Sequence, residues 1–156
     1  MLNGVSYIYI LLRVGQMNVY PLTTIVTLAL VILGYVLASG VSRARATYAE
    51  KRQDSDMFHT LEIYSDKHFM IAFRNHQNFL EQFVLLIPLI WICAISVSDL
   101  LASLFGSLFF VGRVWWARAY PRNFGHRPAV ILCLFSFVAL LLSVISSTIY
   151  ALTQLL

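Results

Sequence analysis

The apolar residues of this chain fall into four long runs, and the short segments between the runs hold nearly all of the charge. A helix needs roughly 20 residues to cross about 30 Å of hydrocarbon, and each run is long enough to do so. The pattern therefore predicts four transmembrane helices, over residues 19–40, 69–97, 100–120 and 128–152. We expect them to form one all-α membrane domain within residues 1–156.

The segments that connect the predicted helices differ in length and in their turn signals. Residues 96–99 hold two serines and an aspartate, which predicts a tight turn between the second and third helices. Pro121 favours the end of the third helix because it has no backbone N–H, and Pro128 suits the start of the fourth. The long connection over residues 41–68 is predicted to lie in the cytoplasm, as a lid or a surface for a partner.

Residues 1–18 form an N-terminal extension that is apolar but short for a membrane span, and Arg13 interrupts it. Three interpretations stay open. The first is a cleaved signal peptide, although the segment lacks a basic start and a small-residue cleavage site. The second is that translation truly starts at Met17, and the third is that the segment forms an interfacial helix.

Composition and charge support a membrane protein and predict its orientation. The chain is 60% hydrophobic and 12% charged, with a mean hydropathy of +0.77, whereas an average soluble domain carries about 25% charged residues. The basic residues share two connections with most of the acids, so the net charge of +4 does not indicate nucleic-acid binding. By the positive-inside rule both connections lie in the cytoplasm and both termini lie on the other side, at the inner membrane if the cell is bacterial. The basic residues of the two connections and adjoining helix ends are Arg43, Arg45, Lys51, Arg52, Lys67, Arg74, Arg113, Arg118, Arg122 and Arg127.

The two cysteines, Cys93 and Cys133, lie inside apolar runs. A disulfide framework or a metal site needs clustered Cys or His residues, and the sequence has no such cluster. We therefore predict no metal and interpret both cysteines as small buried hydrophobic residues.

Polar residues in the first turns of the second predicted helix are the first sign of a binding site. Arg74, Asn78 and Glu81 recur at i, i+4 and i+7, so they share one stripe of the helix, with His76 close by. An ionised side chain is costly at the centre of a bilayer, and such residues usually face a partner or a cavity. An ion pair between Arg74 and Glu81 that only locks helices together is the simpler alternative.

A second polar stripe ends the third predicted helix. Arg113, Trp116 and Tyr120 recur at i, i+3 and i+7, and Arg127 follows at the start of the fourth helix. Taken singly, these residues are typical of snorkelling anchors and an interfacial aromatic belt. Two stripes at the same membrane depth instead favour a polar pocket, suited to a small zwitterionic ligand with more than one carboxylate.

These segments resemble the signatures of a known family. Residues 74–81, RNHQNFLE, resemble the R-x-H-x-N-x-x-E motif that opens helix two of the MAPEG family, the membrane-associated proteins in eicosanoid and glutathione metabolism. Residues 112–120, GRVWWARAY, resemble the segment that ends helix three, and Arg127 follows Tyr120 at the offset of the arginine that activates the thiol in leukotriene-forming members. The resemblance, to a microsomal glutathione transferase-like member of bacterial type, covers about residues 19–152.

The resemblance implies a left-handed four-helix bundle that forms homotrimers, with glutathione bound near the cytoplasmic side between neighbouring subunits. Arg127 would be catalytic and would stabilise the glutathione thiolate. Arg43 and Arg45, at the end of helix one, would reach a neighbour's ligand. An apolar electrophile would arrive from the membrane lipids. The implied glutathione ligands are Arg74, His76, Asn78, Glu81, Arg113, Trp116 and Tyr120.

Three residues depart from the family pattern and leave an alternative function open. Gln82 follows the glutamate where Tyr or Asn is frequent, Val84 replaces a common proline, and Trp116 replaces Tyr or His. The leading hypothesis is a glutathione transferase or peroxidase, or an enzyme using another small thiol. The alternative is a non-catalytic family member that binds lipid or serves as a scaffold or accessory subunit. A transporter is disfavoured, because the first and fourth predicted helices carry no charge.

Overall fold

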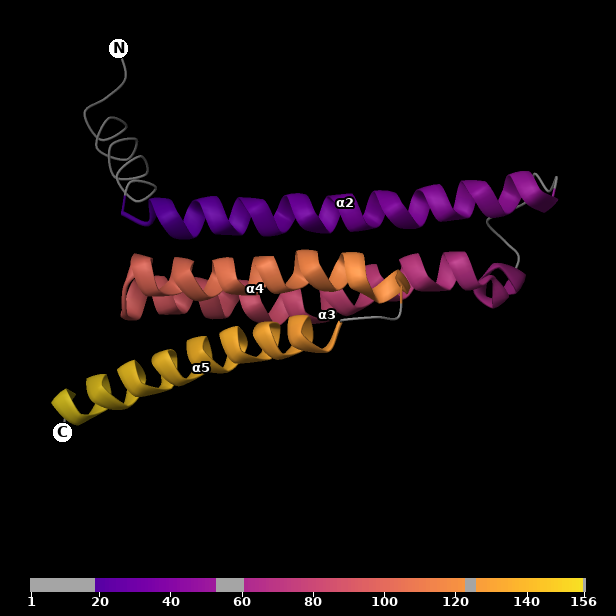
Figure 1. Ribbon diagram of the computed structural model, residues 1–156. Helices are drawn as coiled ribbons and strands as arrows, with labels where there is room; N and C mark the ends of the chain where they lie inside the picture. The colour runs from indigo at the N-terminus through magenta and orange to yellow at the C-terminus, as the bar shows by residue number, and fades with distance from the viewer. Residues whose placement is uncertain (1–18, 53–60, 123–125, 156) are drawn as a thin grey trace, which may run out of the picture.

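The structure is a computed structural model that describes residues 19–52, 61–122 and 126–155. The described part contains four long helices and no strand, which confirms the all-α prediction (Figure 1). All four helices are long and apolar enough to cross a membrane, so the chain is a multi-pass integral membrane protein. The elements are α2 (Pro21–Arg52), the 3-10 helix η1 (Leu61–Ser65), α3 (Lys67–Ser96), α4 (Asp99–Ala119), the 3-10 helix η2 (Tyr120–Arg122) and α5 (Arg127–Leu155).

Successive helices run in opposite directions, so the molecule has two distinct ends. The start of α2, the α3–α4 turn and the end of α5 lie together at one end, here called the turn end (Figure 1). The other end, here called the basic end, holds the end of α2 and the starts of α3 and α5. Both basic segments of the sequence therefore meet at one end of the bundle.

Helix α2 extends further than the sequence pattern predicts. It spans 32 residues and continues to Arg52, so residues 41–52 of the predicted connection are helical. That stretch is rich in Ala, Arg, Glu and Lys, which favour helix, and it has no Gly or Pro. At 1.5 Å per residue α2 is about 48 Å long, well beyond the hydrocarbon thickness. Arg43 and Arg45 consequently lie inside α2 rather than at its end.

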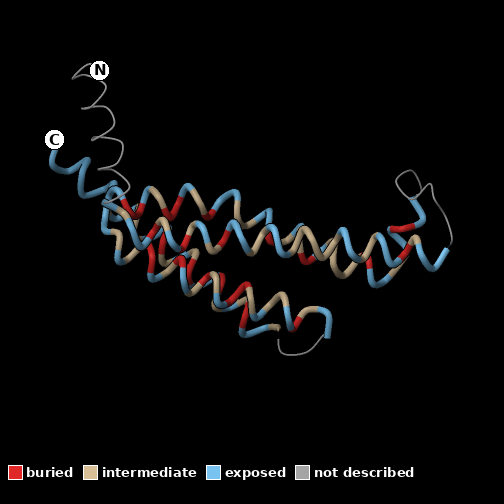
Figure 2. The backbone as a smooth tube through the Cα atoms, turned by 90° about the horizontal axis from the view of Figure 1, so that it is seen from above, coloured by how far each residue is buried: buried red, intermediate tan, exposed pale blue. Residues whose placement is uncertain are grey.

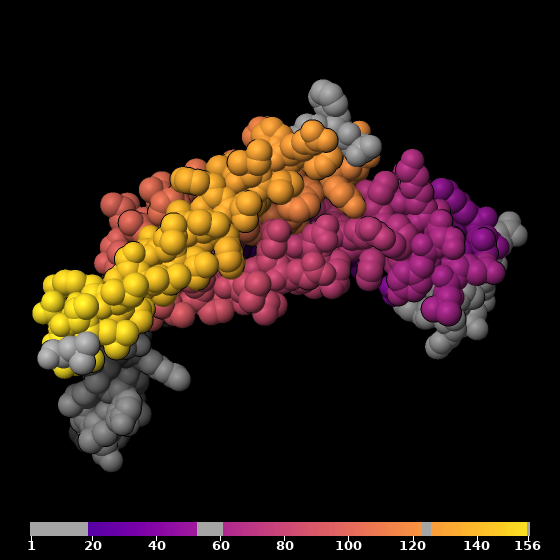
Figure 3. Space-filling model, turned by 90° about the horizontal axis from the view of Figure 1, so that it is seen from below, coloured from indigo at the N-terminus to yellow at the C-terminus, as the bar shows by residue number. Residues whose placement is uncertain are grey.

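The end of α2 and the start of α3 project past α4 and α5 at the basic end (Figure 3). A small apolar cluster of Tyr48, Ile63 and Phe69 joins the two helices there. Helix α3 begins at Lys67, where the Asp66 carboxylate caps it by accepting a hydrogen bond from the Phe69 N–H at 2.8 Å. The predicted connection thus contains a helical extension of α2, a 3-10 helix and the capped start of α3. Residues 53–60 of this connection lie outside the described part, and so does the N-terminal extension over residues 1–18.

The turn end confirms the predicted tight turn between the second and third spans. Ser98 caps α4 by accepting a hydrogen bond from the Leu101 N–H at 3.1 Å. The Asp99 carboxylate accepts hydrogen bonds from the N–H groups of Leu22 and Thr23, at 3.1 and 2.8 Å. Because these are the first turns of α2, one carboxylate ties the start of α2 to the α3–α4 turn.

The main core runs along the axis of the bundle. Exposed positions occur along all four helices (Figure 2), and many of them carry large apolar side chains. Ile25, Tyr35, Leu100 and Ile131 are each more than 60% exposed, as expected for surfaces that face lipid tails. Cys93 and Cys133 are buried and free, as predicted. Helix α4 approaches its neighbours closely through glycine: a Cβ at Gly106 would lie 2.7 Å from a Val26 methyl group, too close for any side chain.

Candidate functional site

Arg113 lies at the centre of the polar region. It comes from the last two turns of α4, and its exposed fraction is 0%. Its Nη2 donates a hydrogen bond to the backbone carbonyl of Asn75 on α3 at 3.2 Å. Its guanidinium carbon lies 4.4 Å from the ring centre of Trp116 and 5.5 Å from that of Phe79. Two aromatic faces therefore hold the cation in place by cation–π attraction.

The guanidinium is only partly satisfied. Nε and Nη1 of Arg113 are buried, and neither has a hydrogen-bond partner among the described residues. The indole N–H of Trp116, in contact with the same cation, is also buried without a partner. A buried donor left unpaired costs about 1–3 kcal/mol, and more when it is charged. The site consequently has spare donor capacity for an acceptor such as a carboxylate.

Asn75 positions Arg113, and sequence reasoning did not identify it. Besides its carbonyl bond to Arg113, its Nδ2 donates to the backbone carbonyl of Ala117 at 3.2 Å, which joins α3 to α4. Asn75 is rotated by about 100° from Arg74 around the helix, so a search for one polar stripe leaves it out. Its place in the polar run of residues 74–78, in a helix whose second half is apolar, was the available signal.

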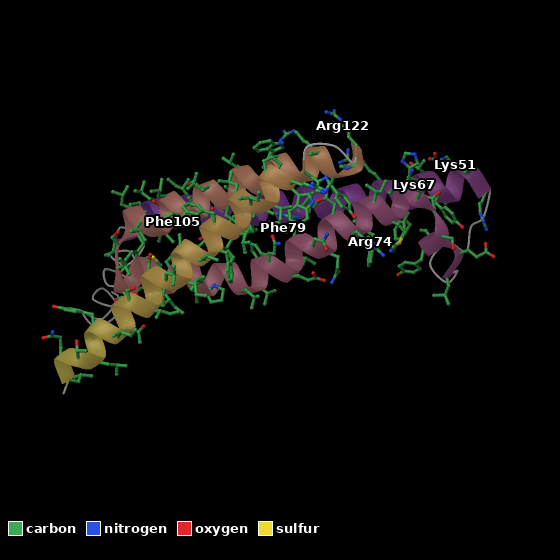
Figure 4. All side chains as sticks on the ribbon, turned by 60° about the horizontal axis from the view of Figure 1, so that its bottom comes forward. Lys51, Lys67, Arg74, Phe79, Phe105 and Arg122 are labelled. Carbon is green, nitrogen blue, oxygen red and sulfur yellow. The ribbon has the colours of Figure 1, made fainter. Side chains whose placement is uncertain are left out.

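The polar stripe of α3 faces outward from a single chain. Arg74 and Glu81 are exposed and Asn78 is half-buried, and Figure 4 shows Arg74 on the α3 ribbon near the basic end. Gln77 Nε2 lies 3.5 Å from a Glu81 carboxylate oxygen. Arg74 and Glu81 do not form an ion pair with each other; the ion pair found within the described residues joins Arg52 and Glu62. The alternative of an Arg74–Glu81 ion pair is therefore wrong for the single chain.

The predicted residues do not converge on one cavity of a single chain. The structure brings Arg113 and Trp116 together, but Arg113 turns into the α3–α4 interface while Arg74 and Glu81 face outward. Neither stripe lines the cavities described below, and the pocket between the two stripes stays a prediction. The other predicted residues lie around the basic end: His76 and Tyr120 are half-buried, Arg43 and Arg127 are exposed, and Arg45 lies 5.7 Å from the Phe69 ring centre.

Arg127 has the position that the sequence predicted for it. It is the first residue of α5, and it is exposed. The N-terminus of a helix carries partial positive charge from its free N–H groups, and the guanidinium adds a full charge there. The two together make a local environment that favours an anion.

An apolar cavity of about 250 Å³ lies between α3, α4 and α5, beside the outward stripe. Phe109, Cys133 and Phe137 contribute to its walls, and Gln82 lines it next to Glu81 in sequence. The Oε1 atom of Gln82 is buried without a hydrogen-bond partner among the described residues. The cavity suits an apolar molecule that offers one hydrogen-bond donor.

Comparison with known proteins gives one family. The family model described as "MAPEG family" matches residues 23–149, which includes most of each of the four spans and both polar stripes. No curated protein matches the sequence. Because the family match extends over most of the sequence, the chain belongs to the MAPEG family.

Proposed function

We propose that this protein is a membrane-bound glutathione transferase that works as a homotrimer, with its basic end in the cytoplasm. The observation that carries the proposal is the outward-facing stripe of α3 in a MAPEG chain. If glutathione binds between subunits, its ligands should be exposed in an isolated chain, and Arg74 and Glu81 are. A hydrophilic stripe on a helix otherwise exposed to lipid is costly unless a partner covers it.

The charges of the stripe fit the chemistry of glutathione. Arg74 would bind one carboxylate of the tripeptide, and Glu81 would pair with its amino group. Arg113 would bind the second carboxylate through its two unpaired donors, after the Trp116 ring that covers it turns aside. The remaining polar groups proposed to contact glutathione are those of His76, Asn78, Trp116 and Tyr120, with Arg43 and Arg45 supplied by a neighbouring subunit.

Arg127 would activate the thiol. A free thiol has a pKa of about 8.5, so little of it is thiolate at neutral pH, and the thiolate is the nucleophile. A guanidinium at a helix N-terminus stabilises the anion; lowering the thiol pKa by about two units takes about 2.7 kcal/mol. The thiolate would attack an apolar electrophile held in the cavity beside Gln82, forming a sulfur–carbon bond while the leaving group departs. Attack on a hydroperoxide oxygen would use the same thiolate.

Replacing Arg127 tests the proposal. Arg127→Ala should still bind glutathione but should lose the ultraviolet absorbance of the thiolate. Its conjugation rate with a generic electrophile should fall about 25-fold at pH 7, the factor given by a return of the thiol pKa from about 6.5 to about 8.5. The rate should recover above pH 8.5. Arg122→Ala removes a charge at the same end and should change neither property; wild-type conjugation by Arg127→Ala would contradict the mechanism.

A non-catalytic role is the second candidate, and the burial of Arg113 favours it. The cation has no exposed surface, and Phe79 and Trp116 cover it. An indole can donate but cannot accept a hydrogen bond, so Trp116 offers fewer interactions than the Tyr or His of the family pattern. Measuring glutathione binding beside conjugation separates the candidates: binding without turnover would favour a lipid-binding or scaffold protein.

A further inference from the structure

A second cavity lies at the basic end, between α2 and α3, and of the residues proposed to contact glutathione only Arg43 lines it. Its volume is about 490 Å³, within the range of small-molecule sites. Its α3 wall includes Ile71, Ala72 and Asn75. Asn75 is rotated by about 100° from Arg74, so this wall and the outward stripe occupy different sides of α3.

The wall of the cavity changes from apolar to charged along α2. Gly40 lines it and lies about 28 Å along α2 from Pro21, close to the thickness of the hydrocarbon, which places the level of Gly40 near the headgroups when the span starts at Pro21. Pro121, directly after the last turn of α4, also lines the cavity. On one side of this level the α2 wall is apolar, with Val36 and Leu37; on the other side it carries Arg43, Thr47 and Lys51.

The polar half of the cavity carries positive charge that can bind an anion. Arg43 and Lys51 are exposed cations, and neither makes an ion pair within the described residues. Asp66 also lines the cavity, but one of its oxygens is already used to cap α3. The walls also include two buried polar atoms without a partner in the described part, the Tyr48 hydroxyl and Asn75 Oδ1.

We propose that this cavity binds one anionic phospholipid. Its phosphate lies between Arg43 and Lys51, and one acyl chain lies along Val36, Leu37 and Ile71. A free phosphate or glycerol phosphate leaves the apolar half uncovered, and a tripeptide thiol finds no polar partner there. Basic pockets between helices at the cytoplasmic face are a recurrent form of anionic-lipid site. The site needs neither catalysis nor glutathione, although Arg43 is also a proposed glutathione contact, so lipid binding is measured separately from conjugation.

Gly40 provides a direct test because it borders the cavity and has open space around it. A Cβ added there meets no atom within 4 Å, so the first atom of a larger side chain has room beside the cavity. Gly40→Leu also raises helix propensity, so the variant should fold. It should bind no phosphatidylglycerol in the cavity, and its melting temperature should no longer respond to that lipid.

The experiment uses the full chain in detergent, with lipid binding followed by native mass spectrometry and the melting temperature by tryptophan fluorescence. Phosphatidylglycerol should raise the melting temperature by about 3 °C at ten times its Kd, while phosphatidylcholine and glycerol 3-phosphate should not. Arg43→Ala/Lys51→Ala should weaken phosphatidylglycerol binding about 30-fold. Arg118→Ala/Arg122→Ala removes two exposed cations of the same end that do not line the cavity, and should leave binding unchanged.

Three results would overturn the proposal. Equal shifts with phosphatidylglycerol and phosphatidylcholine would show that charge does not select the lipid. A lipid response that survives in Gly40→Leu would place the lipid elsewhere. Loss of glutathione affinity in Gly40→Leu, with no response to any lipid in the wild-type protein, would assign the cavity to the thiol ligand instead.

Discussion

The turn end and the basic end of the bundle differ in the charge of the polar groups that they leave unpaired. At the turn end the Asp99 carboxylate accepts two backbone hydrogen bonds, and the Ser147 hydroxyl donates to the Ser96 carbonyl at 2.9 Å. Buried polar atoms without partners in the described part occur at both ends: the Thr23 and Thr27 hydroxyls at the turn end, and atoms of Tyr48, Asn75 and Arg113 at the basic end and just below it. The ends differ in charge, because the unpaired groups at the turn end are neutral hydroxyls, whereas those at the basic end include a guanidinium, whose unpaired donors cost more and can bind an anion.

Replacing Arg113 should give the largest effect, because it should lower glutathione affinity without lowering the free energy of unfolding. Arg113→Met keeps a similar length without charge, and exchanging a poorly paired buried charge for an apolar side chain is often neutral or stabilising. The free energy of unfolding should therefore stay equal or rise. Glutathione affinity should fall about 10–100-fold, because charge-assisted hydrogen bonds are worth about 1.5–3 kcal/mol each. Thermal unfolding and equilibrium binding measure the two quantities; a large loss of stability with unchanged affinity would make Arg113 a structural residue.

Replacing Asp99, at the turn end, should lower the free energy of unfolding and leave ligand affinity unchanged. Asp99→Ala removes both hydrogen bonds to the start of α2, and we expect a loss of about 2–3 kcal/mol in the free energy of unfolding. Glutathione and lipid affinity of the folded protein should not change, because the residue lies at the far end. Asp99→Asn retains one acceptor oxygen and should lose about half as much. Chemical denaturation of detergent-solubilised protein gives the comparison, and a binding defect in Asp99→Ala would show that the two ends are coupled.

Substitutions at two glycines should change stability less, and they distinguish a closely packed position from an open one. Gly106→Ala places a Cβ 2.7 Å from Val26, within the packed core, and should destabilise by about 1–3 kcal/mol. Gly40→Ala, on α2 beside the open cavity, should stabilise by up to about 1 kcal/mol through helix propensity alone. Opposite signs in thermal unfolding are expected; equal destabilisation would mean that a neighbouring subunit packs against Gly40.

Sequence patterning predicted the spans well because burial in lipid leaves a long apolar run. It predicted the turn at residues 96–99 and the start of α5 at Arg127, since both follow from local signals. It missed the extension of α2 to Arg52, where hydropathy falls although helix propensity continues. It also placed Arg113 beside Arg74, because helical spacing gives the face of each helix but not the rotation of one helix against another. Asn75, which fixes that rotation through two hydrogen bonds, belongs to no periodic pattern.

The smallest expected effect is a change in stability at Tyr48, which lines the proposed lipid cavity. Tyr48→Phe deletes a buried hydroxyl that has no partner in the described part, and keeps the ring that packs with Ile63 and Phe69. In lipid-free detergent the variant should be more stable than wild type by up to about 1 kcal/mol, because the desolvation cost of the hydroxyl disappears. With phosphatidylglycerol bound, the wild-type hydroxyl gains a phosphate or ester oxygen as acceptor, so the advantage of the variant should shrink or reverse. Paired melting curves with and without the lipid measure the difference, and an advantage that does not depend on lipid would place the hydroxyl outside the binding site.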